Sequence, residues 1–263
     1  SAVTVHRINQ DGTLGALVSQ PTPLDCGIFA HQIRTTPSNQ RALLVTRGND
    51  ASAGKPEDPG ALKVFGFTGG VLTPQASIAP GNGFGFGPRH LDFHPQQPWV
   101  FVSVERQNQL QAYMLQADGS LAAGPMFVQT TLADPAHVLP GQAAGAIRLH
   151  PNGRFVYVTN RNSGVVDFEG KKVSHGGENN IAVFAIDQTT GEPTLIQHSA
   201  ARALHLRTVS LEPGGRLLVA ASILPMAVRD GDRVVRRAAD LSVHRIGDDG
   251  RLDLVRQYDV DTG

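Results

Sequence analysis

Short runs of mostly apolar residues recur along the chain, each bounded by glycine, proline or charged positions. The clearest of them read "RALLVT", "WVFVSV", "RFVYVT" and "RLLVAA". Each run has the length of a β-strand, strongly helical periodicity is scarce, and glycine (29) and proline (17) are plentiful. The pattern therefore predicts a mostly β protein.

The runs belong to a longer repeated unit. Four segments align on a proline that follows one strand-like run and precedes the next: Pro37, Pro95, Pro151 and Pro213, at spacings of 58, 56 and 62 residues. Each is followed by a tail that predicts a hairpin, such as "NQLQAYMLQADGSL". A fifth tail, "SAVTVHRINQDGTLG", opens the chain. Each unit thus offers four short strands.

Four antiparallel strands per unit are typical of a propeller blade, so we expect an all-β, β-propeller fold. A β-sandwich is the alternative. We expect one domain over residues 1–263, with a partial blade at the N-terminus and four full units at about 20–78, 79–128, 129–198 and 199–258. Four units are few for a closed ring, which predicts that this chain covers part of a longer propeller.

Two positions in each unit are expected to place mostly polar side chains at the same level along the propeller axis. Counted from the proline, positions minus 6 and plus 10 lie equally far from the turn, so they are expected to be neighbours across the strand pair. The minus 6 residues are His31, Arg89, Gly145 and Arg207, and the plus 10 residues are Arg47, Glu105, Arg161 and Ile223. This arrangement predicts a ring of ionisable groups at one mouth of the propeller.

Long connections leave from the same mouth, at 48–60, 162–178 and 224–238, and others enter it at 79–87 and 133–145. Long loops gathered on one face of a rigid scaffold commonly carry function. The mouth is therefore the predicted site.

Net charge changes the picture of possible partners. Lys plus Arg (23) equals Asp plus Glu (23), so the chain has no general basic field for a nucleic acid or an anionic membrane. A small-molecule partner is expected instead. The sequence contains no apolar run of about 18 residues, so we expect no membrane-spanning segment. The one cysteine, Cys26, favours a reducing compartment, hence the cytoplasm. The oligomeric state is left open.

The ring residues suggest anion binding joined to acid–base chemistry. Guanidinium groups pair with carboxylate or phosphate in a bidentate way, which makes Arg89 and Arg161, with Arg47 and Arg207, candidate substrate-binding residues. His31 or Glu105 is the candidate catalytic acid or base. A set of structural salt bridges is the alternative interpretation of this ring.

Other chemistries find little support. No serine lies in a "GxSxG" motif, and Cys26 has no evident activating partner. His90 and His94 share one strand face without a third ligand at metal-site spacing, so no metal is expected. "GNGFGFG" precedes no helix, so we expect no phosphate-binding glycine loop and no cofactor.

Three motifs in the repeats are "GPRHLDFHP", "IRLHPNGRFVYVTNR" and "RTVSLEPGGRLLVAAS". They resemble the seven-bladed lactonase family, which includes bacterial propeller-type 6-phosphogluconolactonase and fungal 3-carboxy-cis,cis-muconate cyclase. The resemblance implies that His31, Arg89, Glu105 and Arg161 form the site, from "AHQIRTTP", "GPRH", "VSVE" and "VTNR". Where the family often has a histidine two residues before the first of these, this chain has Phe29.

The resemblance leads us to expect hydrolysis of an anionic sugar or carboxylic-acid lactone. A muconate-type lactonising cycloisomerase and a non-catalytic binding propeller are the alternatives, because either would use the same anion-binding face.

Overall fold

The computed structural model describes residues 1–260, and almost all regular structure in this range is β. The helical exception within it is a short 3₁₀ segment, η1 (Pro80–Gly83). No helix in this range is long and apolar enough to cross a membrane. The predicted all-β class is confirmed.

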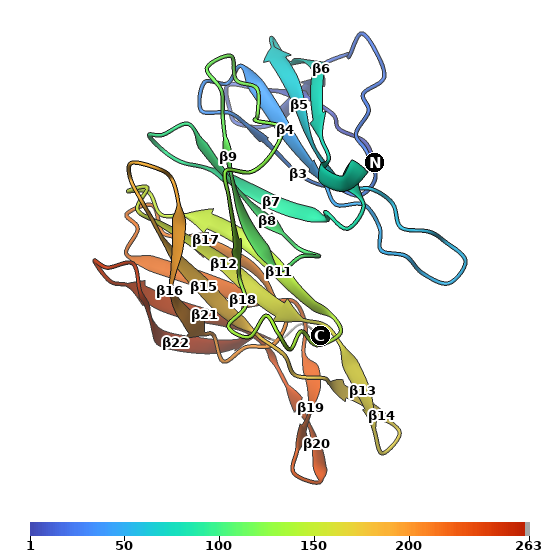
Figure 1. Cartoon of the computed structure of the whole chain (residues 1–263), viewed down its shortest axis with the longest axis vertical. Coiled ribbons are helices and arrows are strands. Elements are labelled where there is room, and N and C mark those ends of the chain that lie inside the picture. The colour runs from blue at the N-terminus through green and yellow to red at the C-terminus, as the bar shows by residue number, and fades with distance from the viewer. Residues whose placement is uncertain (261–263) are drawn as a thin grey trace.

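Four sheets of four antiparallel strands follow one another along the chain (Figure 1). The first sheet has the order β3 (Ala30–Thr35), β4 (Arg41–Thr46), β5 (Ala61–Thr68) and β6 (Val71–Ile78). The second has the order β7 (Pro88–Phe93), β8 (Trp99–Val104), β9 (Gln109–Met114) and β10 (Phe127–Thr130). The third has the order β11 (Gln142–Leu149), β12 (Phe155–Asn162), β15 (Asn180–Ile186) and β16 (Pro193–Ala200). The fourth has the order β17 (Leu206–Leu211), β18 (Leu217–Ser222), β21 (Ala239–Ile246) and β22 (Leu252–Val260). Each sheet therefore has the strand order expected of a propeller blade.

Apolar side chains between successive sheets form the core. One cluster joins the first two sheets, with Val45 and Leu91 among its members. A second cluster joins the second and third sheets, and a third cluster, which includes Tyr157 and Leu218, joins the third and fourth. Burying one such side chain contributes roughly 1.5–3 kcal/mol. This face-to-face packing sets the sheets side by side along an arc (Figure 1).

The turns around the head prolines are tied together by histidines. The ring Nε2 of His94 bonds the carbonyl of Gly153 at 2.9 Å, and that of His150 bonds the carbonyl of Gly215 at 2.8 Å. In each case Nδ1 accepts a backbone N–H from its own turn. A Cβ on Gly153 would lie 2.5 Å from the His94 ring, so glycine is needed there. His94 thus shapes a turn at the opposite end of its strand from the ring positions, and is not paired with His90.

Two of the predicted long loops contain strands of their own. Residues 162–178 form the hairpin β13 (Val165–Phe168) and β14 (Lys171–Ser174). Residues 224–238 form the hairpin β19 (Met226–Asp230) and β20 (Arg233–Arg237). The two hairpins project together from one end of the molecule (Figure 1). These two long connections are therefore ordered by backbone pairing of their own, which the sequence analysis did not predict.

The predicted hairpins at the N-terminus and at the end of the second unit differ in how many of their residues pair. The N-terminal tail forms an isolated pair, β1 (His6–Ile8) and β2 (Leu14–Leu17), around its "DGT" turn. In the second unit the "DGS" turn closes only a short bridge between Leu115 and Leu121. The outer strand β10 begins at Phe127, after a segment that contains Pro125, a residue without the backbone N–H that a strand ladder needs.

Candidate active site

The first strand of every sheet carries a β-bulge at the predicted minus 6 position. The strand register shifts between Ala30 and Gln32, between Pro88 and His90, between Ala144 and Ile147, and between Leu206 and Thr208. The residues within these shifts are His31, Arg89, Gly145 with Ala146, and Arg207. A bulge leaves its extra residue out of the strand ladder and changes where that side chain points. Four equivalent bulges therefore present the ring residues at one level.

Glu105 is the centre of the charged cluster. Its Oε2 accepts a hydrogen bond from Arg89 at 2.7 Å, and its Oε1 accepts bonds from Arg47 at 3.0 Å and Arg161 at 3.1 Å. These three arginines come from three different sheets, and Glu105 itself is only 5% exposed. The structure thus brings together four of the six residues predicted for the site.

The long loop 48–60 adds a second carboxylate. Asp50 accepts a bond from Arg47 Nη2 at 2.6 Å and from Arg106 Nε at 2.6 Å. Arg106 also pairs with Glu57, which accepts the backbone N–H of Gly85. Asp50 and Glu105 therefore both hold the guanidinium of Arg47, through Nη2 and Nε respectively.

His31 lies beside a second histidine that the sequence reasoning had not assigned to the site. The rings of His31 and His90 are 4.7 Å apart, edge to face, and the Nδ1 atoms of both are buried without a hydrogen-bond partner in residues 1–260. Phe29 packs on His31 at 5.8 Å and beneath the guanidinium of Arg47 at 5.6 Å. His31 therefore lies in an aromatic corner next to the arginines.

His205 is the second residue that sequence reasoning missed. Its Nε2 lies 2.6 Å from Arg161 Nη1, and its backbone N–H donates to the side-chain oxygen of Asn179 at 2.7 Å. It stands two residues before Arg207, as Phe29 stands two before His31. A search for polar residues at this third repeated position, minus 8 from the proline, could have found it.

Arg207 lies close enough to the cluster to act on it electrostatically, but it makes no hydrogen bond to it within the described part of the chain. Its charge lowers the pKa of His31 and of Arg161, yet no ion pair or side-chain hydrogen bond joins it to another ring residue in residues 1–260. Ile223, its partner position, is 39% exposed and brings no charge. The fourth sheet thus contributes to the ring mainly through Arg207 and His205.

The protonation states follow from burial and from the guanidinium groups. Burial alone would raise the pKa of Glu105, but Arg89, Arg161 and Arg47 outweigh it and lower that pKa to about 2. Burial, with the charge of Arg89, lowers the pKa of His31 to about 4. Burial lowers the pKa of Arg89 to about 10. At neutral pH the cluster therefore holds an ionised glutamate, charged arginines and a neutral histidine.

The charges do not balance. Counting Arg207, four guanidinium groups stand against the two carboxylates of Glu105 and Asp50, an excess of two positive charges; Arg106 and Glu57 offset each other. The Nε atoms of Arg89 and Arg161 are buried and have no partner in residues 1–260. Buried charge without a counter-charge is costly, so the cluster is suited to an anionic ligand.

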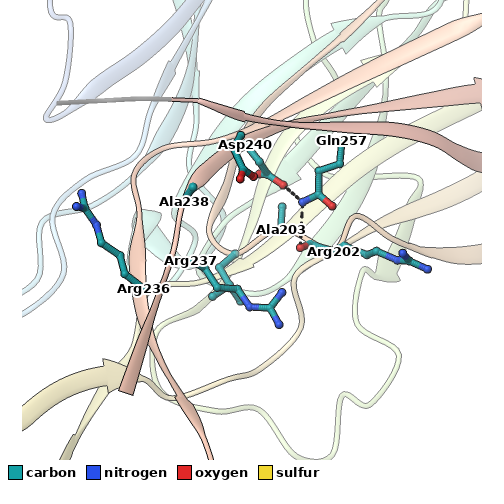
Figure 2. A pocket seen from close by; sticks show the side chains of 9 residues that line it. Arg202, Ala203, Arg236, Arg237, Ala238, Asp240 and Gln257 are labelled. Carbon is teal, nitrogen blue, oxygen red and sulfur yellow. Dashed lines mark hydrogen bonds between the residues drawn. The ribbon is translucent and has the colours of Figure 1, made fainter. Parts of the chain in front are cut away.

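A cavity of about 590 Å³ lies elsewhere, on the fourth sheet. It is lined by Arg202, Arg236, Arg237 and Asp240, among others. In Figure 2, Gln257 bridges the Asp240 carboxylate and the carbonyl of Arg202. No ring residue lines this cavity, so the candidate site is defined by its buried charges and not by this cavity.

Within residues 1–260, no group of three or more His, Cys, Asp or Glu side chains is arranged to hold a metal ion. The cluster presents guanidinium donors, the carboxylates of Glu105 and Asp50, and neutral imidazoles.

Comparison with known proteins identifies relatives that match most or all of this chain. The model of a family described as "Lactonase, 7-bladed beta-propeller" matches residues 1–224. A 6-phosphogluconolactonase of Bacillus subtilis is 28% identical over 230 residues, which cover 84% of this chain and 56% of that protein. One of Yersinia enterocolitica is 22% identical over 265 residues, covering 100% of this chain and 66% of that protein. The chain thus spans a little over half to two thirds of these relatives' lengths.

Solved structures give the same fold. A protein from Lactobacillus plantarum superposes with a TM-score of 0.69 at 25% identity, covering 97% of this chain and 64% of that one. A periplasmic gluconolactonase of Pseudomonas aeruginosa superposes with a TM-score of 0.64 at 18% identity, covering 98% and 63%.

Proposed function

The chain belongs to the seven-bladed β-propeller lactonase family, and we propose that it hydrolyses an anionic lactone of the 6-phosphogluconolactone type. The observation that carries this proposal is the buried cluster in which Arg47, Arg89 and Arg161 surround Glu105. Its excess of positive charge calls for an anion, and a neutral histidine lies beside it.

Arg89 and Arg161 are the proposed binding groups for the carboxylate or phosphate. Both are buried, and the Nε atom of each has no hydrogen-bond partner in residues 1–260 and is sealed from solvent, so an anion bonded there requires neighbouring side chains to move. Arg47 and Arg207 add charge from either side of this pair. A charged donor in such a water-poor site binds an anion more strongly than it would in water.

His31 is the proposed general base. A neutral imidazole accepts a proton from water while the water oxygen bonds to the lactone carbonyl carbon. The ring C–O bond then breaks, the departing alkoxide takes up the proton that His31 accepted from water, and the hydroxy acid is released. Glu105 is the weaker candidate for this role because both its oxygens accept guanidinium bonds and its pKa is about 2. We therefore assign Glu105 the task of holding the arginines in place.

The names of the relatives favour the hydrolase over the cycloisomerase, since both curated relatives are called lactonases. A binding propeller would show no turnover at all. The test offers 6-phosphogluconolactone and a carboxymuconolactone to the protein and to its Arg89→Ala variant. The products distinguish a hydrolase, a cycloisomerase and a binding propeller.

We expect hydrolysis that Arg89→Ala reduces by at least 100-fold, with Arg216→Ala, at an exposed arginine, unchanged. Ring opening of the muconolactone to an unsaturated acid would identify the cycloisomerase. Absence of turnover from the unmodified protein would overturn the proposal.

The cytoplasm is the proposed compartment, because Cys26 is a buried free thiol. Cell fractionation tests it, and recovery from the periplasm would contradict it.

A further inference from the structure

His205 has a backbone conformation that L-residues rarely adopt. Its φ is 56°, and the equivalent residues of the first two units, Phe29 and Gly87, have φ of 55° and 51°. A left-handed conformation costs a non-glycine residue free energy and persists only where the surroundings impose it. The recurrence of this conformation ahead of the bulge suggests that it positions the residue at minus 8 over the ring.

The surroundings of His205 tie it to the strand that carries Arg161. The side-chain oxygen of Asn179 accepts the backbone N–H of His205 at 2.7 Å and that of Asn162 at 3.2 Å. Asn162 directly follows Arg161 in β12. The backbone of His205 and that of the residue after Arg161 are therefore bonded to one shared side-chain oxygen.

The contact with Arg161 assigns the tautomer of His205. A guanidinium only donates hydrogen bonds, so Nε2 at 2.6 Å from Arg161 Nη1 accepts, and the ring proton resides on Nδ1. Burial and the charges of Arg161 and Arg207 lower the pKa of His205 to about 4, so the ring is neutral at pH 7. Nδ1 makes no hydrogen bond within residues 1–260, and it is not among the polar atoms sealed from solvent.

We propose that His205 donates its Nδ1–H to the carbonyl oxygen of the bound lactone and stabilises the oxyanion that forms there. This inference rests on the proposed lactone hydrolysis. When water adds to the carbonyl carbon, the C=O electron pair moves to oxygen and the hydrogen bond strengthens. When the C=O bond re-forms, the ring C–O bond breaks, and His205 remains neutral throughout. A donor fixed before the reaction begins costs no reorganisation as the charge develops.

The repeat itself supplies a matched pair of variants. His205→Phe removes the donor and copies Phe29, which has nearly the same φ in this chain, so the backbone is expected to be retained. His205→Asn keeps an N–H near the place of Nδ1, and asparagine tolerates a left-handed backbone. The pair separates loss of the donor from loss of the fold.

Steady-state hydrolysis at pH 7 is the test. We expect His205→Phe to lower kcat by about 10²–10³-fold with KM changed less than about threefold, and His205→Asn to stay within about tenfold of the unmodified protein. Because the ring acts in its neutral form, the loss should be equal at pH 6 and pH 8. Unchanged kcat in His205→Phe, an effect on KM alone, or equal losses in both variants would overturn the inference.

A spectroscopic measurement tests the tautomer without turnover. Long-range ¹H–¹⁵N correlation spectra of the histidine rings, assigned by comparison with His205→Phe, should show the proton of His205 on Nδ1. A proton on Nε2 would refute the inference even if the protein is a lactonase. If the unmodified protein hydrolyses no lactone, the proposed function fails first and this inference falls with it.

Discussion

Replacement of Glu105 by glutamine tests the charge balance on which the site depends. The substitution keeps the shape of the side chain but leaves the guanidinium groups of Arg47, Arg89 and Arg161 around a neutral amide. The amide nitrogen then also points two N–H donors into a place where only acceptors are useful. We expect a large loss of stability at neutral pH.

The magnitude follows from the pKa of Glu105, which the fold lowers from 4.5 to about 2. At about 1.4 kcal/mol per unit, a displacement of this size corresponds to roughly 3 kcal/mol in favour of the ionised, folded state. Since the folded pKa is the lower one, this contribution is fully present above about pH 5 and is lost as the pH falls toward 2. Glu105→Gln should therefore lose roughly 3–5 kcal/mol at pH 7, as breaking other buried ion pairs does.

Urea unfolding at pH 7, followed by tryptophan fluorescence, measures this loss. With a slope of about 3 kcal/mol per molar, the midpoint should fall by about 1 M or more. Glu192→Gln, at an exposed glutamate, is the control and should not move it. Inorganic phosphate should restore part of the lost stability, because an added anion takes the place of the missing carboxylate. An unchanged midpoint in Glu105→Gln would refute the reasoning.

Three further results are expected. The kcat/KM for lactone hydrolysis should rise with pH through about 4, where His31 loses its proton, and stay level to pH 8; a rise centred near 6.5 would instead indicate an unburied histidine. Asp50→Asn should raise KM several-fold with little change in kcat, because only the position of Arg47 is weakened; equal falls in kcat would contradict this. Gly87→Ala should cost about 2 kcal/mol by thermal or urea unfolding, because φ is 51° and its Cβ would meet Arg106 at 2.4 Å; a neutral effect would argue against that close approach.

The pairing of Arg89 with Glu105 could be predicted because strand pairing is periodic. Once the turn is located, residues equally far from its middle on the two strands are expected to lie near each other, and the repeat transfers this rule to every unit. The predicted register itself was wrong by the bulge: Arg161 pairs with Ala143 and not with Gly145, and the backbone N–H of Glu105 donates to Gly87. The same rule placed His31, Arg47 and Arg161 at the same height. It required only the repeat spacing and the register of a hairpin.

The bulges and the role of His205 could not be read from the same pattern. A bulge shifts the register by one residue, and no single residue type announces it, since the bulged positions hold His31, Arg89, Gly145 with Ala146, and Arg207. His205 lies outside regular pairing, and its contact with Arg161 joins two sheets. Hairpins β13–β14 and β19–β20 were not predicted because charged residues interrupt the apolar alternation of their strands.

The central claim is that the excess positive charge of the ring selects an anionic lactone. The most direct measurement compares kcat/KM of the protein for 6-phosphogluconolactone and for unphosphorylated gluconolactone at pH 7, with spontaneous hydrolysis subtracted. We expect the phosphorylated lactone to be preferred by at least 100-fold, and added salt to reduce that preference, because charge-assisted bonds to the arginines contribute only for the anion. Equal rates for the two lactones, or a preference for the uncharged one, would contradict the assignment of the arginines to anion binding.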